Sequence, residues 1–151
     1  MLTYKRERFA TRLPVDRLYT RSHYWLLEVE PAVFRIGFTK FATRMLGDIV
    51  EYKFEIESGD RIEFGQKIGW IEGFKALSDL YSVAEGNFEG GNPELGADIT
   101  LLESDPYNRG WFYQVRGRPD PDGVDASGYA TILDATIDKM QSGRHDTDSH
   151  G

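Results

Sequence analysis

The sequence contains no cysteine among its 151 residues. Without a thiol, the polypeptide cannot form disulfides or a thiolate zinc site, and it has no cysteine nucleophile or thiol redox chemistry of its own. Long apolar runs are also missing. None approaches the roughly 18 residues that a membrane-spanning helix needs, and no signal-peptide core is present. These absences exclude disulfide scaffolds and predict a chain that does not enter a membrane.

Basic residues are in the minority. The chain has 18 Lys and Arg against 25 Asp and Glu, which gives a net charge of −7. A general nucleic-acid binder needs a basic face, so this class is excluded. The charged fraction of 28% and the aromatic fraction of 13% are ordinary for a globular domain, and the length is enough for one domain with its own core.

The charges are unevenly distributed. Residues 1–12 carry four bases and one acid, whereas residues 68–108 carry eight acids and one base, Lys75. Protein surfaces normally interleave the two signs. Charge by itself favours an ordinary solvated acidic face. The alternative is that Lys75 is set apart for a specific use.

Alternating apolar and polar residues predict a mainly β chain. The clearest case is 50–57, where apolar side chains alternate with charged ones and one face is expected to be buried. Glu30-Pro31 reads as a hairpin connection between two apolar runs. The strands expected from these patterns cover 24–29, 33–36, 50–57, 62–64, 67–72, 77–83 and 111–115.

One short helix is predicted inside the β region, over 39–46. Thr39 is its expected N-cap, and Gly47 ends it. Its predicted apolar face consists of Phe38, Ala42, Met45 and Leu46. This stripe is interpreted as core packing and not as a ligand site.

A second helix is predicted near the C-terminus, capped by Asp125 or Ser127, with its apolar face between Tyr129 and Met140. Residues 85–96 are rich in Gly, Asn and Glu without a period, so they are predicted to form a loop. Residues 99–103 fit either a short helix or a strand.

The first 17 residues show no clear period, and an ordered arm, a frayed tail and a targeting peptide all remain open. Glu7 and Asp16 count against a targeting peptide, because such peptides are poor in acids. Opposite charge allows the hypothesis that this basic arm docks on the acidic segment around Lys75.

Catalytic and nucleotide-binding motifs are missing: there is no GxSxG, HExxH, P-loop or GxGxxG pattern. His145 and His150 lie in a polar stretch where a free tail is favoured over a metal site. His23, beside an apolar run, is interpreted as structural. The chain therefore does not look like an enzyme with an assembled active site.

Lys75 stands between two predicted strands, in the segment Gly73-Phe74-Lys75-Ala76. This arrangement predicts that its amine projects from the tip of a hairpin. A surface lysine in a turn is the ordinary interpretation. An exposed lysine amine can also be an acylation point for a cofactor.

Three segments carry a family resemblance. Residues 47–50 read GDIV, residues 72–82 read EGFKALSDLYS, and residues 105–111 read DPYNRGW. They resemble the G-D-I-V, E-S-V-K-A-x-S-D-V-Y-S-P and D-P-Y-G-x-G-W patterns of the glycine cleavage system H protein, a lipoyl carrier family. The resemblance covers about residues 19–118.

The resemblance implies a barrel-sandwich hybrid, of the lipoyl/biotinyl-domain type, with one short internal helix and a C-terminal helix. It also implies lipoate in amide linkage on Lys75. In this family the lipoyl arm shuttles an aminomethyl group and reducing equivalents between the P, T and L proteins. The implied protein is a non-catalytic carrier subunit, expected to be monomeric, that first meets a lipoate-attaching ligase or octanoyltransferase.

The resemblance also implies roles for three further residues. Glu72 is expected to be recognised by the lipoylating enzyme, and Ser22 and Asp79 are expected to belong to the cleft that holds the arm. The family's acid in H-E-W is Tyr24 here, and Gly73-Phe74 replaces Ser-Val. These departures keep two alternatives open: a similar carrier in sulfur oxidation or lipoate relay, and an unmodified binding module. Biotin carriage is disfavoured, because a Met-Lys-Met context is missing.

The expected domain organisation has three parts. A basic arm covers 1–18, the carrier domain covers 19–141, and a polar, disordered tail covers 142–151. The short, acid-containing extension before the carrier domain favours the bacterial cytoplasm over the mitochondrial matrix.

Overall fold

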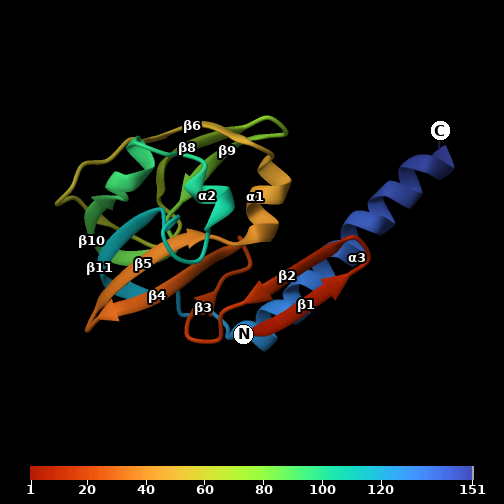
Figure 1. Cartoon of the computed structure of the whole chain (residues 1–151), viewed down its shortest axis with the longest axis horizontal. Helices are drawn as coiled ribbons and strands as arrows, with labels where there is room; N and C mark the ends of the chain where they lie inside the picture. Colours follow the sequence, from red (N-terminus) through yellow and green to blue (C-terminus); the bar gives the residue numbers. More distant parts are fainter. Residues whose placement is uncertain (151) are drawn as a thin grey trace.

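Three β-sheets form the main body of the fold, which confirms the mainly β prediction (Figure 1). The computed structural model describes the backbone of residues 1–150 and the side chains of residues 1–143. The first sheet is the hairpin of β1 (Leu2–Arg6) and β2 (Phe9–Leu13). The second contains, in spatial order, β3 (Leu18–Tyr19), β4 (Tyr24–Glu30), β5 (Val33–Phe38), β11 (Tyr113–Pro119), β10 (Ala84–Gly91) and β7 (Arg61–Ile62). The third contains β6 (Ile49–Phe54), β8 (Lys67–Gly73) and β9 (Leu77–Tyr81).

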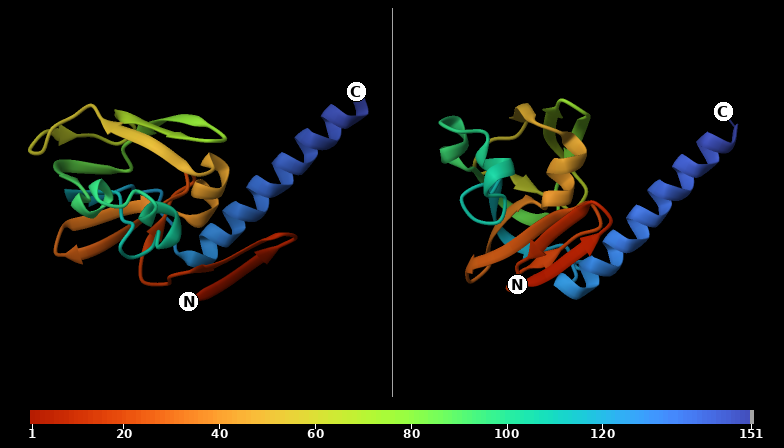
Figure 2. Two further views of the ribbon diagram at one scale, coloured as in Figure 1. Left: turned by 45° about the horizontal axis from the view of Figure 1, so that its top comes forward. Right: turned by 45° about the vertical axis from the view of Figure 1, so that its right-hand side comes forward.

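Short helical segments lie between strands, and one long helix ends the chain. Within residues 1–150 these are α1 (Lys40–Leu46), the 3₁₀ turn η1 (Pro93–Gly96), α2 (Leu101–Ser104) and α3 (Ala126–His150). The distal part of α3 projects away from the sheets (Figure 2). The predicted tail starts at residue 142, whereas α3 continues through that point. The side chains of His145 and His150 lie outside the described residues.

Two hydrophobic cores hold these layers together. The larger one lies between the six-stranded and three-stranded sheets, where Phe112 packs against Phe38 and Phe54 with ring centroids 4.8 Å apart in both pairs. The smaller core joins the N-terminal hairpin to α3, β4 and α1. In it Tyr19 stacks on Tyr129 at 4.9 Å. Burial of such aromatic rings supplies much of the free energy that favours the folded state.

Helix α1 begins and ends as its sequence predicts. The Thr39 side chain accepts a hydrogen bond from the Ala42 N–H at 3.3 Å, and Gly47 closes the helix at φ = 75°. The predicted apolar face is wrong in part. Phe41, Thr43 and Leu46 are the buried residues of the helix, and Met45 is exposed. The reason is that Phe41 packs in the smaller core, against the N-terminal hairpin, which is distant in the sequence.

The N-terminal arm is an ordered hairpin that packs against α3. Tyr4 Oη donates to Asp134 at 2.8 Å, and Arg6 pairs with Asp138. Gln141 donates to Glu7 at 2.6 Å. The acids that Arg6 contacts are therefore on α3 and not in the segment around Lys75, which corrects the docking hypothesis for this residue.

The predicted loop over 85–96 is wrong, because most of it is strand β10. This strand pairs with β11 from Ala84 to Gly91 and with β7 at Gly86. A Cβ on Gly86 would lie 2.2 Å from the Arg116 carbonyl oxygen. Glycine is thus present because two backbones approach closely, and its lack of a side chain removed the alternation from which strands are predicted.

Smaller corrections concern strand ends. Strand β6 stops at Phe54, and a bulge between Ile49 and Glu51 leaves Val50 exposed. Strand β9 ends at Tyr81 and not at residue 83. Residues 101–104 form a helix, which settles the helix-or-strand alternative there. Asp125 Oδ1 accepts from the Gly128 N–H at 2.8 Å, so Asp125 caps the start of α3.

Candidate functional site

Lys75 lies at the tip of the hairpin formed by β8 and β9, as the sequence predicts. The Gly73 N–H donates to the Ala76 carbonyl at 2.8 Å and closes the turn. Strands β8 and β9 pair in antiparallel register from Lys67 to Glu72. The Lys75 side chain is exposed. The hairpin therefore displays the amine at the surface.

The hairpin tip is fixed to the junction between α1 and β6. The Phe74 N–H donates to the Asp48 carbonyl at 3.0 Å, and the Lys75 N–H donates to the Leu46 carbonyl at 2.9 Å. These bonds join the tip to a segment that is about 30 residues away in the sequence. Two backbone hydrogen bonds at consecutive residues restrict both the position and the rotation of the tip.

Two glycines make this contact possible. Gly47 has φ = 75°, and a Cβ there would lie 2.9 Å from Lys75 Cγ. A Cβ on Gly73 would lie 2.1 Å from the Leu46 carbonyl oxygen. A side chain at either position would push the tip away from α1.

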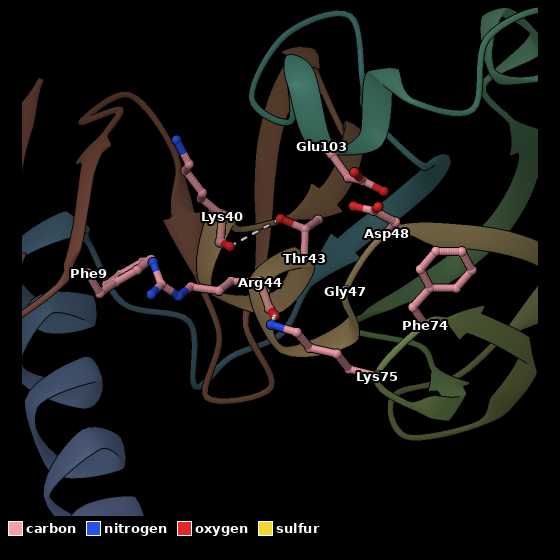
Figure 3. Close-up of a pocket in the computed structure, with 9 residues that line it drawn as sticks. All are labelled: Phe9, Lys40, Thr43, Arg44, Gly47, Asp48, Phe74, Lys75 and Glu103. Atoms are coloured by element: carbon pink, nitrogen blue, oxygen red, sulfur yellow. Dashed lines mark hydrogen bonds between the residues drawn. The ribbon is translucent and has the colours of Figure 1, made fainter.

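A cavity of about 490 Å³ opens beside the tip. Figure 3 shows its lining side chains, which come from the N-terminal hairpin, α1, the α1–β6 junction, the β8–β9 tip and α2. They belong to Phe9, Lys40, Thr43, Arg44, Gly47, Asp48, Phe74, Lys75 and Glu103. The lining thus combines two aromatic rings with charges of both signs.

The Lys75 amine lies next to the C-terminal end of α1. Its Nζ is 3.4 Å from the Arg44 carbonyl oxygen. A cation is stabilised there, because the last carbonyls of a helix carry partial negative charge. On the other side of the cavity, Glu103 accepts a hydrogen bond from the Ile49 N–H and so joins α2 to the start of β6.

The other three predicted site residues, Glu72, Asp79 and Ser22, lie outside the cavity beside Lys75. Glu72 is on β8, directly opposite Glu51 of β6. Asp79 is on β9, 3.4 Å from Lys67 Nζ. Ser22 lies before β4, 2.9 Å from the Thr20 hydroxyl. None of the three predicted residues lines the cavity beside Lys75.

Tyr24 is a core residue. Its side chain is buried and packs on Phe38 with ring centroids 5.2 Å apart. Burial raises the pKa of its hydroxyl far above the ordinary value. At the position where the resemblance implies an acid, this side chain therefore makes an apolar contact inside the fold.

His23 is structural, as interpreted from the sequence. Burial lowers its pKa to about 4. Its Nδ1 lies 2.8 Å from the Tyr129 hydroxyl, and that hydroxyl is also 2.8 Å from Thr39 Oγ1. Tyr129 thus connects α3 to the residue that caps α1.

Most residues of the cavity lining are not indicated by local sequence patterns. Lys40, Thr43 and Arg44 lie on a helix whose apolar stripe indicates core packing, and Phe9 and Glu103 lie in segments far away in the sequence. The local signals are the GDIV segment, which contains Gly47 and Asp48, and the hairpin-tip segment, which contains Phe74 and Lys75. Spatial proximity of the other residues follows from tertiary packing and has no sequence signature.

Metal-binding and membrane-spanning features are not found in the part of the chain that the structure describes. There, no cluster of His, Asp and Glu has a metal-binding arrangement. No helix among these residues has the length and apolar character to span a membrane.

The family model described as glycine cleavage H-protein matches residues 17–127. The chain belongs to the glycine cleavage H-protein family. Three curated relatives agree with this membership. The glycine cleavage system H protein of Corynebacterium jeikeium is 37% identical over 109 residues, which are 70% of this chain and 85% of the relative. That of Rubrobacter xylanophilus is 35% identical, over 81% of this chain and 95% of the relative. The probable H protein of Natronomonas pharaonis is 38% identical, over 82% and 90%.

A solved family member has the same fold. The crystal structure of a glycine cleavage system H protein from Mycobacterium marinum superposes with a TM-score of 0.70 and 31% identity. The match covers 79% of this chain and 97% of that one. It confirms the barrel-sandwich prediction. The N-terminal hairpin, residues 2–13, lies before the segment that the family model matches.

Proposed function

We propose that this chain is the lipoyl carrier of a glycine cleavage system and that Lys75 is the attachment site. The observation that carries the proposal is the display of Lys75. Its amine is exposed on a hairpin tip that two backbone hydrogen bonds tie to the α1–β6 junction, in a chain of the H-protein family. The partners proposed with it are the P, T and L proteins and a lipoate-attaching enzyme, in a bacterial cytoplasm.

The residues around Lys75 fit a lipoyl group. The amine is accessible for amide formation, and Phe9 and Phe74 give the adjacent cavity apolar walls suited to a hydrocarbon chain. Amide formation removes the charge of Lys75, so the contact with the Arg44 carbonyl no longer stabilises a cation. When bound, the group supplies a dithiolane that can be reduced to a dithiol, chemistry that a chain without cysteine cannot provide.

The polypeptide's own contribution is to position its lysine. The Phe74 and Lys75 amides hold the tip in one orientation, and Gly47 and Gly73 allow it to lie against α1. A tethered group is present at high effective concentration for each partner that binds the domain. We therefore propose a carrier role, with bond chemistry performed by the partners.

A related carrier in another lipoate-dependent pathway is the second candidate. The buried Tyr24 favours it, because this side chain offers no carboxylate where the family has an acid. Reconstitution with P protein separates the two candidates. Exchange of labelled bicarbonate into glycine supports glycine cleavage, and a lipoylated chain that gives no exchange supports the other pathway.

Intact-mass measurement of the protein purified from its native host tests the attachment. We expect one added lipoyl group, located on Lys75 by peptide mapping. The Lys75→Arg variant keeps the positive charge and should fold normally but carry no lipoyl group. A lipoyl group on this variant, or an unmodified native chain, would contradict the proposal.

A further inference from the structure

A second cavity, of about 410 Å³, lies between the turn of the N-terminal hairpin, α1 and α3. It shares Phe9 and Arg44 with the cavity beside Lys75, but Lys75 itself does not line it. We call this second space the hairpin cavity. A volume of this order is typical of sites that bind a small molecule.

Five apolar side chains line the hairpin cavity. Phe9 and Phe41 pack edge to face with ring centroids 5.6 Å apart, and both belong to the smaller core. Met45, Ile137 and Met140 complete the apolar part of the lining. Because methionine side chains are flexible and polarizable, this lining can adapt to an apolar chain.

Two arginines in the lining have unpaired charges. Among the described side chains, Arg8 has no ion pair or hydrogen bond, and the guanidinium of Arg44 contacts only the ring of Phe9, 5.5 Å from its centroid (Figure 3). Arg6 is different, because it pairs with Asp138. The two unpaired guanidinium groups come from different elements and meet at one apolar cavity.

The charges of the lining favour a ligand with one negative charge. Glu7 is the acid of the lining, and it accepts a hydrogen bond from Gln141 at 2.6 Å. Arg8 and Arg44 together exceed it by one positive charge. A carboxylate would balance this excess, and guanidinium groups bind carboxylates through paired N–H donors.

We propose that the hairpin cavity binds a small-molecule carboxylate with an apolar chain, such as a medium-chain fatty acid. The carboxylate lies between Arg8 and Arg44, and the chain packs against Phe41, Met45 and Met140. A cationic occupant is repelled by the arginines, and an uncharged one leaves them unpaired. The site goes beyond the carrier role and does not depend on modification of Lys75.

The site depends on a segment outside the family match. The family model begins at residue 17, whereas residues 6–9 of the lining belong to the N-terminal hairpin. This hairpin is fixed to α3 by the bonds from Tyr4 to Asp134 and from Gln141 to Glu7. The cavity is therefore formed without a ligand, which lowers the cost of binding one.

NMR titration of the isotope-labelled full chain with octanoate tests the proposal. The Met140 and Gln141 amides belong to the hairpin cavity alone, and those of Asp48 and Phe74 belong to the cavity beside Lys75 alone. We expect saturable shifts at Met140 and Gln141 with a Kd of about 1 mM. Octanol has the chain without the charge, and acetate has the charge without the chain. Each should bind at least about tenfold more weakly.

Two variants test the two halves of the site. Arg8→Gln removes one of the unpaired cations, and we expect it to raise the Kd for octanoate about tenfold at low salt, with a smaller effect as salt is raised. Met45→Gln keeps the length and helix propensity of the side chain but replaces an apolar contact. We expect it to raise the Kd about fivefold at all salt concentrations.

Matched controls are available in the same part of the chain. Arg12 is an exposed arginine of the same hairpin that does not line the hairpin cavity, so Arg12→Gln removes the same charge outside the site. Val15 is 66% exposed between β2 and β3, so Val15→Thr removes apolar area elsewhere. Both controls should bind octanoate as the wild type does. All four positions are exposed, so the variants should keep the wild-type melting temperature and weaker binding would not be due to unfolding.

Three results would overturn the proposal. The first is the absence of saturable shifts at Met140 and Gln141, or shifts confined to Asp48 and Phe74, which would place octanoate beside Lys75. The second is an equal Kd for octanoate and octanol, or for wild type and Arg8→Gln at low salt, which would remove the role of the arginines. The third is a change at Met140 and Gln141 on dilution of the protein alone, which would assign the hairpin cavity to a second copy of the chain.

Discussion

Gly47 lies directly against Lys75, the residue proposed to carry the cofactor. A Cβ at Gly47 would be 2.9 Å from Lys75 Cγ and 3.0 Å from the Lys75 backbone nitrogen. The same glycine ends α1 at φ = 75°. One residue therefore both terminates the helix and sets the distance between that helix and the hairpin tip.

Replacing Gly47 should change the display of Lys75. We expect Gly47→Ala to lower the free energy of unfolding by about 1–3 kcal/mol, because of the left-handed backbone and the contact with Lys75. Acylation of Lys75 should slow as the tip is displaced. Gly65→Ala is the matched control, because Gly65 has φ = 77° but nothing within 4 Å of its Cβ position. Equal acylation rates for the two variants would contradict a role for the Gly47 contact.

Gly73 provides a second test of the tip geometry. A Cβ there would lie 2.1 Å from the Leu46 carbonyl oxygen, so Gly73→Ser should push the tip away from α1. The Lys75 N–H, which donates to that same carbonyl, should then exchange with solvent faster. Hydrogen exchange measured by NMR checks this at single residues. Unchanged protection of the Phe74 and Lys75 amides would mean that the tip tolerates a side chain at this position.

The Tyr129 hydroxyl should contribute measurably to stability. It contacts His23 Nδ1 and Thr39 Oγ1, both at 2.8 Å, inside the second core. Tyr129→Phe leaves both partners without this bond, and we expect a loss of about 1–3 kcal/mol in chemical denaturation. Tyr81→Phe serves as the control, because Tyr81 is exposed and its hydroxyl lies 3.4 Å from Asp79. Similar losses in both variants would argue against the buried network.

The folded chain should lose stability as the pH is lowered through the titration of His23. Its pKa is lowered by burial from 6.5 to about 4 in the folded chain, so between these values the unfolded chain binds more protons. Stability therefore rises with pH across this window and is lost as pH falls, by as much as about 3 kcal/mol. Denaturation at several pH values measures the slope. The His23→Gln variant should show a smaller slope between pH 4 and 6.5, and an identical slope would rule out His23 as its source.

Local patterns predicted the elements that local contacts define. The Thr39 hydroxyl caps α1 through an amide three residues away, and the Gly73–Ala76 turn closes through a bond between near neighbours. Such interactions involve residues that are close in the chain, so they can be predicted from residue types and their spacing. Strand β10 is not predicted, for the opposite reason. At Gly86 the backbones of β10 and β11 approach closely and leave no room for a side chain, so this position cannot contribute to an alternating apolar and polar pattern.

The position of Lys75 at a hairpin tip could thus be predicted from the residues around it. Its surroundings could not. Phe9, Arg44 and Glu103 reach the same cavity from the N-terminal hairpin, α1 and α2, whereas Ser22 and Asp79, expected nearby, lie outside the cavity lining. Turn formation depends on a few adjacent residues, but which side chains meet across the molecule depends on how the sheets and helices pack. The residues next to Lys75 in the sequence therefore determine its exposed position at the hairpin tip. Tertiary packing determines which other side chains lie beside it.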